Sequence, residues 1–155
     1  MAQKSTIITA ICVIALTTIF VWIYLQAVFG VPQTADPMDL NQVARGSVVY
    51  SENCAECHGK NLQGQPNWRV RNDDGTLPAP PHDETGHTWH HPDQLLFDIT
   101  QKGGQASAPP GFKSAMPPFE EVLSDGDIWA ALSFIKSHWP DLVRKRQTRM
   151  NKVRN

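Results

Sequence analysis

Two cysteines and a histidine lie within five consecutive residues, Cys54-Ala55-Glu56-Cys57-His58. At this spacing two thiols on one helical turn can each form a thioether to a vinyl group of the same porphyrin, and the imidazole that follows can bind the iron from one side. The C-x-x-C-H pattern therefore predicts a covalently attached haem c, held by Cys54 and Cys57, with His58 as an axial ligand.

Two other kinds of site use a C-x-x-C pair, namely zinc sites and thiol–disulfide redox sites. A cysteine-rich zinc site needs more thiols than this chain has, because its third cysteine, Cys12, lies in an apolar run far from the motif. We expect Cys12 to be a lipid-facing or packing residue. A redox pair stays open as an alternative, although nothing in that chemistry requires a histidine at the next position.

Met116 is the best candidate for a second axial ligand. It lies in a loop-like stretch, residues 103–119, and is followed by Pro117-Pro118-Phe119. A thioether is a soft, neutral ligand that raises the reduction potential of haem iron. The alternative is a methionine that fills a gap in the core. The other three methionines are less suitable, since one is terminal, one adjoins a linker and one lies in the basic tail.

A group of histidines follows the motif: His82, His87, His90 and His91. Such a group is compatible with a copper or zinc site. The alternative is a turn in which the imidazoles bond to backbone or to haem propionates. Trp68 and Arg69 are also candidates for contacts with propionates, or else they are a packing tryptophan and a solvated arginine.

An uncharged apolar segment runs from Ile7 to Phe29. As a helix its 23 residues reach roughly 34 Å, enough to cross the core of a bilayer. A cleaved signal peptide is the alternative, but its apolar core is usually only about 7–15 residues long. Lys4 precedes the segment and acidic residues follow it, so the positive-inside rule places the N-terminus in the cytoplasm. We therefore expect an uncleaved single-pass anchor over residues 1–29 and a linker over residues 30–38.

Apolar residues at helical spacing predict three helices beyond the linker. They cover residues 39–54, 92–102 and 124–139. In the first of them, Gly46 costs about 1 kcal/mol relative to alanine, which favours a close helix contact at that position. In the last, Ser124 and Asp127 form a pair that resembles a capping box, and Pro140 ends the helix.

Charge is distributed unevenly along the chain. Residues 36–140 contain 14 acidic and 7 basic side chains, a net charge of −7, whereas residues 141–155 contain one acid and six bases, a net charge of +5. The acidic part favours a basic protein partner, and no nucleic-acid partner is expected. The basic tail, either helical or frayed, suits anionic lipid headgroups or an acidic partner face.

These motifs together resemble the class I cytochromes c, in their bacterial form with one haem and a membrane anchor. The resemblance covers roughly residues 39–140, the cytochrome c domain. It rests on Gly46 with Tyr50, on Cys54–Gly59, on Met116–Phe119 and on the helix that ends Phe134-Ile135-Lys136. The histidine-rich stretch is also similar to sequences of this subgroup.

The resemblance implies an all-α fold around one covalently bound haem c. It also implies axial ligation by His58 and Met116, and a crossing of the first and last helices near Gly46 and Phe134.

The function that follows is one-electron transfer on the outer, periplasmic face of the cytoplasmic membrane, and not enzymatic catalysis. Redox proteins would donate and accept the electron, and the protein would be freestanding or a subunit of a respiratory complex. One alternative is a haem enzyme or gas sensor in which Met116 leaves the axial site open. Another is a metal-handling protein that uses the histidine group.

Overall fold

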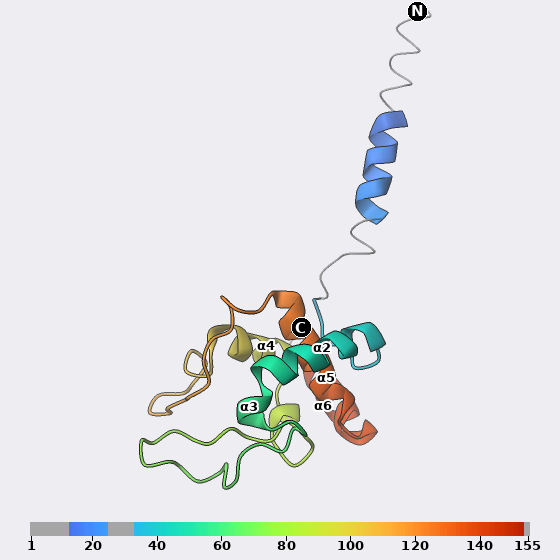
Figure 1. Cartoon of the computed structure of the whole chain (residues 1–155). Coiled ribbons are helices and arrows are strands. Elements are labelled where there is room, and N and C mark those ends of the chain that lie inside the picture. Colours follow the sequence, from blue (N-terminus) through green and yellow to red (C-terminus); the bar gives the residue numbers. More distant parts are fainter. Residues whose placement is uncertain (1–12, 25–32, 154–155) are drawn as a thin grey trace, which may run out of the picture. The chain divides into compact units, whose positions relative to one another are not determined.

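The computed structural model describes residues 13–24 and 33–153. The chain divides into two units, residues 1–31 and residues 32–155. In the first unit, residues 13–24 form a helix with exposed side chains (Figure 1). The predicted anchor covers residues 1–29, with its apolar segment at residues 7–29, so both of its ends lie outside the described residues. Among the helices of residues 13–24 and 33–153, none is long and apolar enough to cross a membrane.

The second unit is built from helices and long loops. In chain order the helices are α2 (Leu40–Asn53), α3 (Ala55–His58), the 3-10 turn η1 (Thr88–His90), α4 (Asp93–Lys102), α5 (Asp125–Ser137) and α6 (Asp141–Val153). An isolated β-bridge between Thr76 and Lys113 is the one piece of extended pairing over the described ranges. The prediction of an all-α domain is therefore confirmed.

The helix ends follow from local chemistry. The Asp39 carboxylate caps α2 by accepting hydrogen bonds from the next turn's backbone N–H groups. Ser124 and Asp127 form the predicted capping box at the start of α5. Gly103 follows the last residue of α4 with a φ of 81°, a left-handed conformation that suits glycine.

Helices α2 and α5 cross at close range. A Cβ atom on Gly46 would lie 1.9 Å from the carbonyl oxygen of Ala130 and 2.9 Å from the Cβ of Phe134. One turn later, the Tyr50 ring packs against Phe134 with centroids 5.3 Å apart. The predicted crossing near Gly46 and Phe134 is confirmed, and the absence of a side chain at Gly46 is what allows it.

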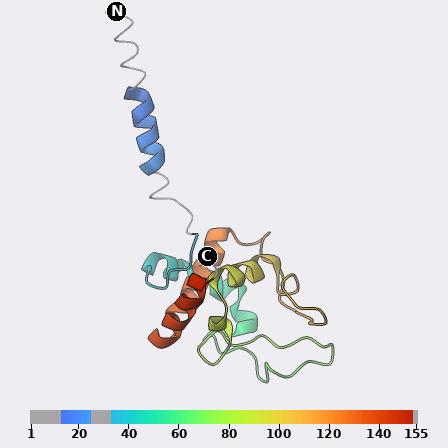
Figure 2. The same ribbon diagram turned by 180° about the vertical axis from the view of Figure 1, so that it is seen from behind.

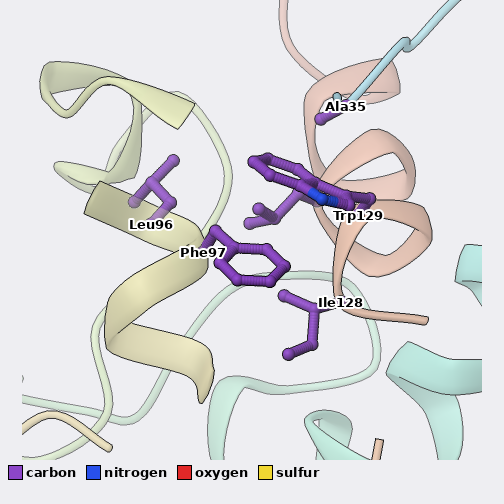
Figure 3. Close-up of a cluster of buried hydrophobic side chains, with 6 residues drawn as sticks. Ala35, Leu96, Phe97, Ile128 and Trp129 are labelled. Carbon is purple, nitrogen blue, oxygen red and sulfur yellow. The ribbon is translucent and has the colours of Figure 1, made fainter. Parts of the chain in front are cut away.

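A first hydrophobic cluster joins α4 to α5. It consists of Ala35, Leu96, Phe97, Ile128, Trp129 and Leu132. Figure 3 shows Phe97 of α4 between Trp129 and Ile128 of α5, and the Phe97 and Trp129 rings stack with centroids 4.4 Å apart. Burial of one large apolar side chain contributes roughly 1.5–3 kcal/mol, so this cluster is a main source of stability.

A second cluster surrounds the cysteine motif. It consists of Tyr50, Ala55, Leu62, Ile135 and Trp139, with Cys54 and Phe134 packed against it. Because Ala55 lies between the two cysteines, the motif is fixed directly on the core. The position of the motif therefore depends on the same α2–α5 contact that Gly46 permits.

Two long loops lie side by side in the second unit. The loop after the motif and the loop after α4 join at the Thr76–Lys113 bridge, and the Lys113 ammonium donates to the Asp74 carbonyl at 3.1 Å. Figure 1 shows both loops, green and gold, extending on the same side of the domain. This contact places the segment that carries Met116 beside the segment that follows His58.

Candidate functional site

The cysteine motif occupies the junction between α2 and α3. Cys54 is the C-terminal cap of α2, and its backbone N–H donates to the Tyr50 carbonyl at 2.9 Å. The N–H groups of Cys57 and His58 both donate to the Cys54 carbonyl, at 3.2 and 2.9 Å. The three residues therefore share a single helical turn, as covalent attachment to one porphyrin requires.

The two cysteines are free thiols in different surroundings. Cys54 is half-buried and Cys57 is exposed. Burial, with a smaller contribution from the neighbouring Cys57, raises the pKa of the Cys54 thiol to about 11. Thiol–disulfide exchange relies on a lowered cysteine pKa. The raised pKa of Cys54 therefore counts against the alternative of a redox pair.

The imidazole of His58 is held by a backbone carbonyl. Its Nδ1 lies 2.8 Å from the carbonyl oxygen of Pro80, which can only accept, so Nδ1 carries the proton and Nε2 has the free lone pair. His58 is 8% exposed, and burial lowers its pKa while the bond to Pro80 acts in the opposite direction. His58 is therefore neutral at pH 7, which is the form that binds a metal. Its Nδ1–H donates to a backbone carbonyl, as the non-ligating nitrogen of a metal-binding histidine usually does.

His82 stacks on His58. The two ring centroids are 3.9 Å apart and the planes differ by 21°. Nδ1 of His82 lies 2.7 Å from the hydroxyl of the buried Thr88, and the Trp139 indole donates to the His82 carbonyl at 2.7 Å. Burial, with the nearby His58 ring, lowers the pKa of His82 well below its usual value. A neutral imidazole, held through its Nδ1 and through the backbone carbonyl of the same residue, thus supports the His58 ring from one side.

The loop that carries Met116 is tied to the end of α4. The Gly104 N–H donates to the Met116 carbonyl at 3.1 Å, and the Phe119 N–H donates to the Gln101 carbonyl at 3.1 Å. A Cβ on Gly103 would lie 2.9 Å from the Pro118 nitrogen, so a larger residue would push the loop away. Met116 itself is half-buried. Ligation of iron by Met116 stays a prediction.

The four histidines named above do not converge on one point. Among the described residues, no group of three or more histidine, cysteine, aspartate or glutamate side chains is placed to hold a metal ion. Instead the His90 ring stacks on Trp89 at 3.7 Å, and the His87 ring stacks on Trp68 at 5.4 Å. These stacks favour the structural interpretation of the histidine-rich stretch over a second metal site.

Trp68 and Arg69 contact each other. The Arg69 guanidinium lies 3.9 Å from the centroid of the Trp68 ring, a cation–π contact. Arg69 is exposed and Trp68 is half-buried. The predicted contact of either residue with a haem propionate stays a prediction.

The residues of the motif fit a haem c. The structure provides two free thiols at the attachment spacing and, on the same turn, a neutral imidazole whose Nε2 has no hydrogen-bond partner among the described residues. The carbonyl of Pro80 and the ring of His82 fix the orientation of that imidazole. The sequence did not predict these two contacts, because Pro80 and His82 lie 22 and 24 positions from His58 and no local pattern indicates that they come beside it.

A family model described as Cytochrome c matches residues 43–139. The match covers more than half of the 155 residues, so the chain belongs to the cytochrome c family. With the motif at Cys54, Cys57 and His58, this membership assigns one covalently bound haem c, and the cofactor prediction is confirmed. The family transfers electrons through haem, typically as carriers rather than enzymes, and is found outside the cytoplasm. Searches of curated proteins and of solved structures each return no match.

Proposed function

We propose that this cytochrome c is a one-electron carrier held at the outer face of the cytoplasmic membrane, with His58 and Met116 as the axial ligands of its iron. The observation that carries the proposal is the 2.8 Å contact between the Nδ1 of His58 and the Pro80 carbonyl. This contact leaves the lone pair of Nε2 free to bind iron, on the same turn that carries both cysteines.

The residues around the motif would bind the haem and orient its iron ligand. Bound haem c supplies an iron that alternates between two oxidation states and so accepts and releases one electron. Cys54 and Cys57 would hold the porphyrin on the α2–α3 turn, and the Pro80 carbonyl and the His82 ring restrain the His58 imidazole. A restrained ligand set changes little between oxidation states, which suits electron transfer.

Met116 is proposed as the ligand that closes the second axial position. The hydrogen bonds at Gly104 and Phe119 and the bridge at Thr76 restrain its loop at both ends and against the segment that follows the motif. Two prolines directly after Met116 restrict the backbone of the loop that carries it. If His58 and Met116 fill both axial positions, peroxide, O₂ and CO would find no coordination site, which would distinguish a carrier from the alternative haem enzyme or gas sensor.

Membrane anchoring is proposed from the N-terminal segment. Residues 7–29 carry no charge, and the described part of that segment, residues 13–24, is helical with exposed apolar side chains. Lys4 before the segment and acidic residues after it favour a cytoplasmic N-terminus and a periplasmic haem domain. Resistance of the protein to alkaline extraction from membranes would support this anchor, and release into the soluble fraction would contradict it.

Redox proteins are the proposed partners. This cytochrome would bind them either as a freestanding carrier or as a subunit of a respiratory complex. The acidic charge of residues 36–140 favours a basic docking face, so electron transfer should slow as salt rises. A rate that does not depend on salt would contradict this docking mode.

The optical spectrum of the reduced, full-length protein tests the closed iron. We expect CO to leave the low-spin spectrum unchanged and to shift it only after Met116→Ala. Met38→Ala is the matched control, because Met38 is 73% exposed and lies outside the Met116 loop. A CO shift in the unmodified protein would favour the haem enzyme or sensor.

A further inference from the structure

Helix α6 attaches to the domain by one side only. Its buried Gln147 donates from Nε2 to Asp93 Oδ1 at 2.5 Å, and Asn151 donates from Nδ2 to Asp93 Oδ2 at 2.8 Å. The buried ammonium of Lys136 lies 2.6 Å from the same carboxylate. The half-buried Val143 packs against the second hydrophobic cluster. These contacts hold the basic C-terminal segment as an ordered helix on the outside of the domain (Figure 2).

The other side of α6 is a row of cations. It consists of Lys145, Arg146, Arg149 and Lys152, all of them exposed. At 100° per residue these four project within an arc of roughly 120°. Over the described residues none of the four forms an ion pair, whereas Arg144, nearer the buried side, pairs with Asp141. Leu142 is 62% exposed in the same arc. We call these five residues the basic face of α6.

The basic face differs in charge from the rest of the domain. Residues 36–140 carry a net charge of −7. A basic redox partner steered toward that acidic surface would be repelled by α6. The basic face therefore suits a second, anionic surface.

We propose that the basic face of α6 binds anionic lipid headgroups. Four exposed lysine and arginine side chains on one side of a helix match the clusters of basic residues that bind anionic lipid headgroups. The nine residues between the predicted anchor and the domain, numbers 30–38, span at most about 32 Å, which confines the domain near a bilayer. The proposal rests on the anchor of the proposed function and is independent of the haem ligands.

Electrostatic attraction determines how strongly the basic face should bind anionic lipid. Each basic residue near an anionic surface strengthens binding by roughly fivefold, and salt weakens the attraction within a Debye length of about 10 Å at 0.1 M. Removing two of the four cations should therefore weaken the contact roughly 25-fold. An anionic membrane would at the same time repel the acidic part of the domain, residues 36–140. Lipid contact through α6 would therefore leave that acidic part facing basic partners.

The test uses the full-length, haem-loaded protein in nanodiscs of neutral phosphatidylcholine, with or without phosphatidylglycerol. A nitroxide is attached at Thr148→Cys, beside the basic face, in a Cys12→Ser background. Its accessibility to a neutral, water-soluble nickel chelate is then measured. We expect accessibility to fall in the anionic discs at low salt and to recover at high salt. The variant Lys145→Gln/Arg149→Gln should lose this response.

The matched control is Lys60→Gln/Lys102→Gln, which removes two exposed cations elsewhere on the domain and should keep the response. Equal accessibility in both kinds of disc, or a full response in the α6 variant, would overturn the proposal. A response to polyglutamate but not to phosphatidylglycerol would assign the face to an acidic protein and overturn it too. Failure to copurify with neutral discs would instead contradict the anchor itself, and with it this proposal.

Discussion

Gly46 of α2 packs directly on the backbone of Ala130 in α5, where a Cβ atom would come within 1.9 Å of the carbonyl oxygen. In an open helix, replacing glycine by alanine stabilises by about 1 kcal/mol. Here we expect Gly46→Ala to destabilise the protein by about 1–3 kcal/mol, because the helices must separate to admit the methyl group. Denaturant unfolding followed by circular dichroism measures the change. Ser47→Ala, at the exposed neighbouring position, is the control and should change stability by less than about 0.5 kcal/mol.

The Lys136–Asp93 pair links α5 to α4 in a nearly buried setting, with side-chain exposures of 6% and 15%. We expect Lys136→Met to destabilise by about 3–5 kcal/mol, because a nearly buried carboxylate loses the one cation with which it forms an ion pair among the described residues. The double variant Lys136→Met/Asp93→Asn removes both charges and should recover part of that loss. Equal destabilisation in the single and double variants would mean that packing, not charge, explains the effect.

Asp127 makes part of the stability depend on pH. Burial acts to raise its pKa, but hydrogen bonds from Ser124 and Arg45 outweigh burial and hold that pKa below the ordinary value. A lowered pKa in the folded state contributes stability that is present above the unfolded pKa of about 3.9 and is lost as pH falls through the folded value.

We therefore expect Asp127→Asn to cost about 1–2 kcal/mol at pH 7, from the helix cap and a largely exposed ion pair. The difference from the unmodified protein should shrink below about pH 4. Denaturant unfolding at pH 7, 5 and 3 measures it, with the exposed Glu121→Gln as control. A difference that stays constant over this range would contradict the ionic role of Asp127.

The stack between His82 and His58 should be visible in the ferric protein. We expect His82→Ala to leave the haem attached but to shift the electron paramagnetic resonance spectrum, because the His58 ring loses the neighbour 3.9 Å away that fixes its plane. The cavity should also cost about 1–3 kcal/mol of stability. His90→Ala, at an exposed histidine stacked on Trp89, is the control. Identical spectra for His82→Ala and the unmodified protein would show that Pro80 alone orients the ligand.

Much of the helical framework could be predicted from the sequence, because its signals are local. Asp39 and Ser124 cap helices through side-chain bonds to their own first turn. Gly103 ends α4 through its own backbone conformation. Gly46 indicates a helix crossing, because a glycine inside a helix is unfavourable unless a close contact requires it. Each signal acts within a few residues, where spacing determines geometry.

The supports of the site could not be predicted, because they join distant segments. The carbonyl of Pro80 meets His58 across 22 positions, and a backbone carbonyl has no sequence signature. Likewise, the network at Asp93 brings together side chains from α5 and α6, 43 to 58 positions away. The histidine-rich stretch indicates a metal site by composition alone, and only the stacking of His87 on Trp68 and of His90 on Trp89 favours a structural role instead.

X-ray absorption at the iron edge of the full-length oxidised protein tests the central claim most directly. We predict one sulfur and five nitrogen neighbours around the iron in the unmodified protein and in Met38→Ala, and loss of the sulfur neighbour in Met116→Ala. A coordination shell without sulfur in the unmodified protein would contradict the assignment of Met116, and with it the account of this cytochrome as a closed one-electron carrier.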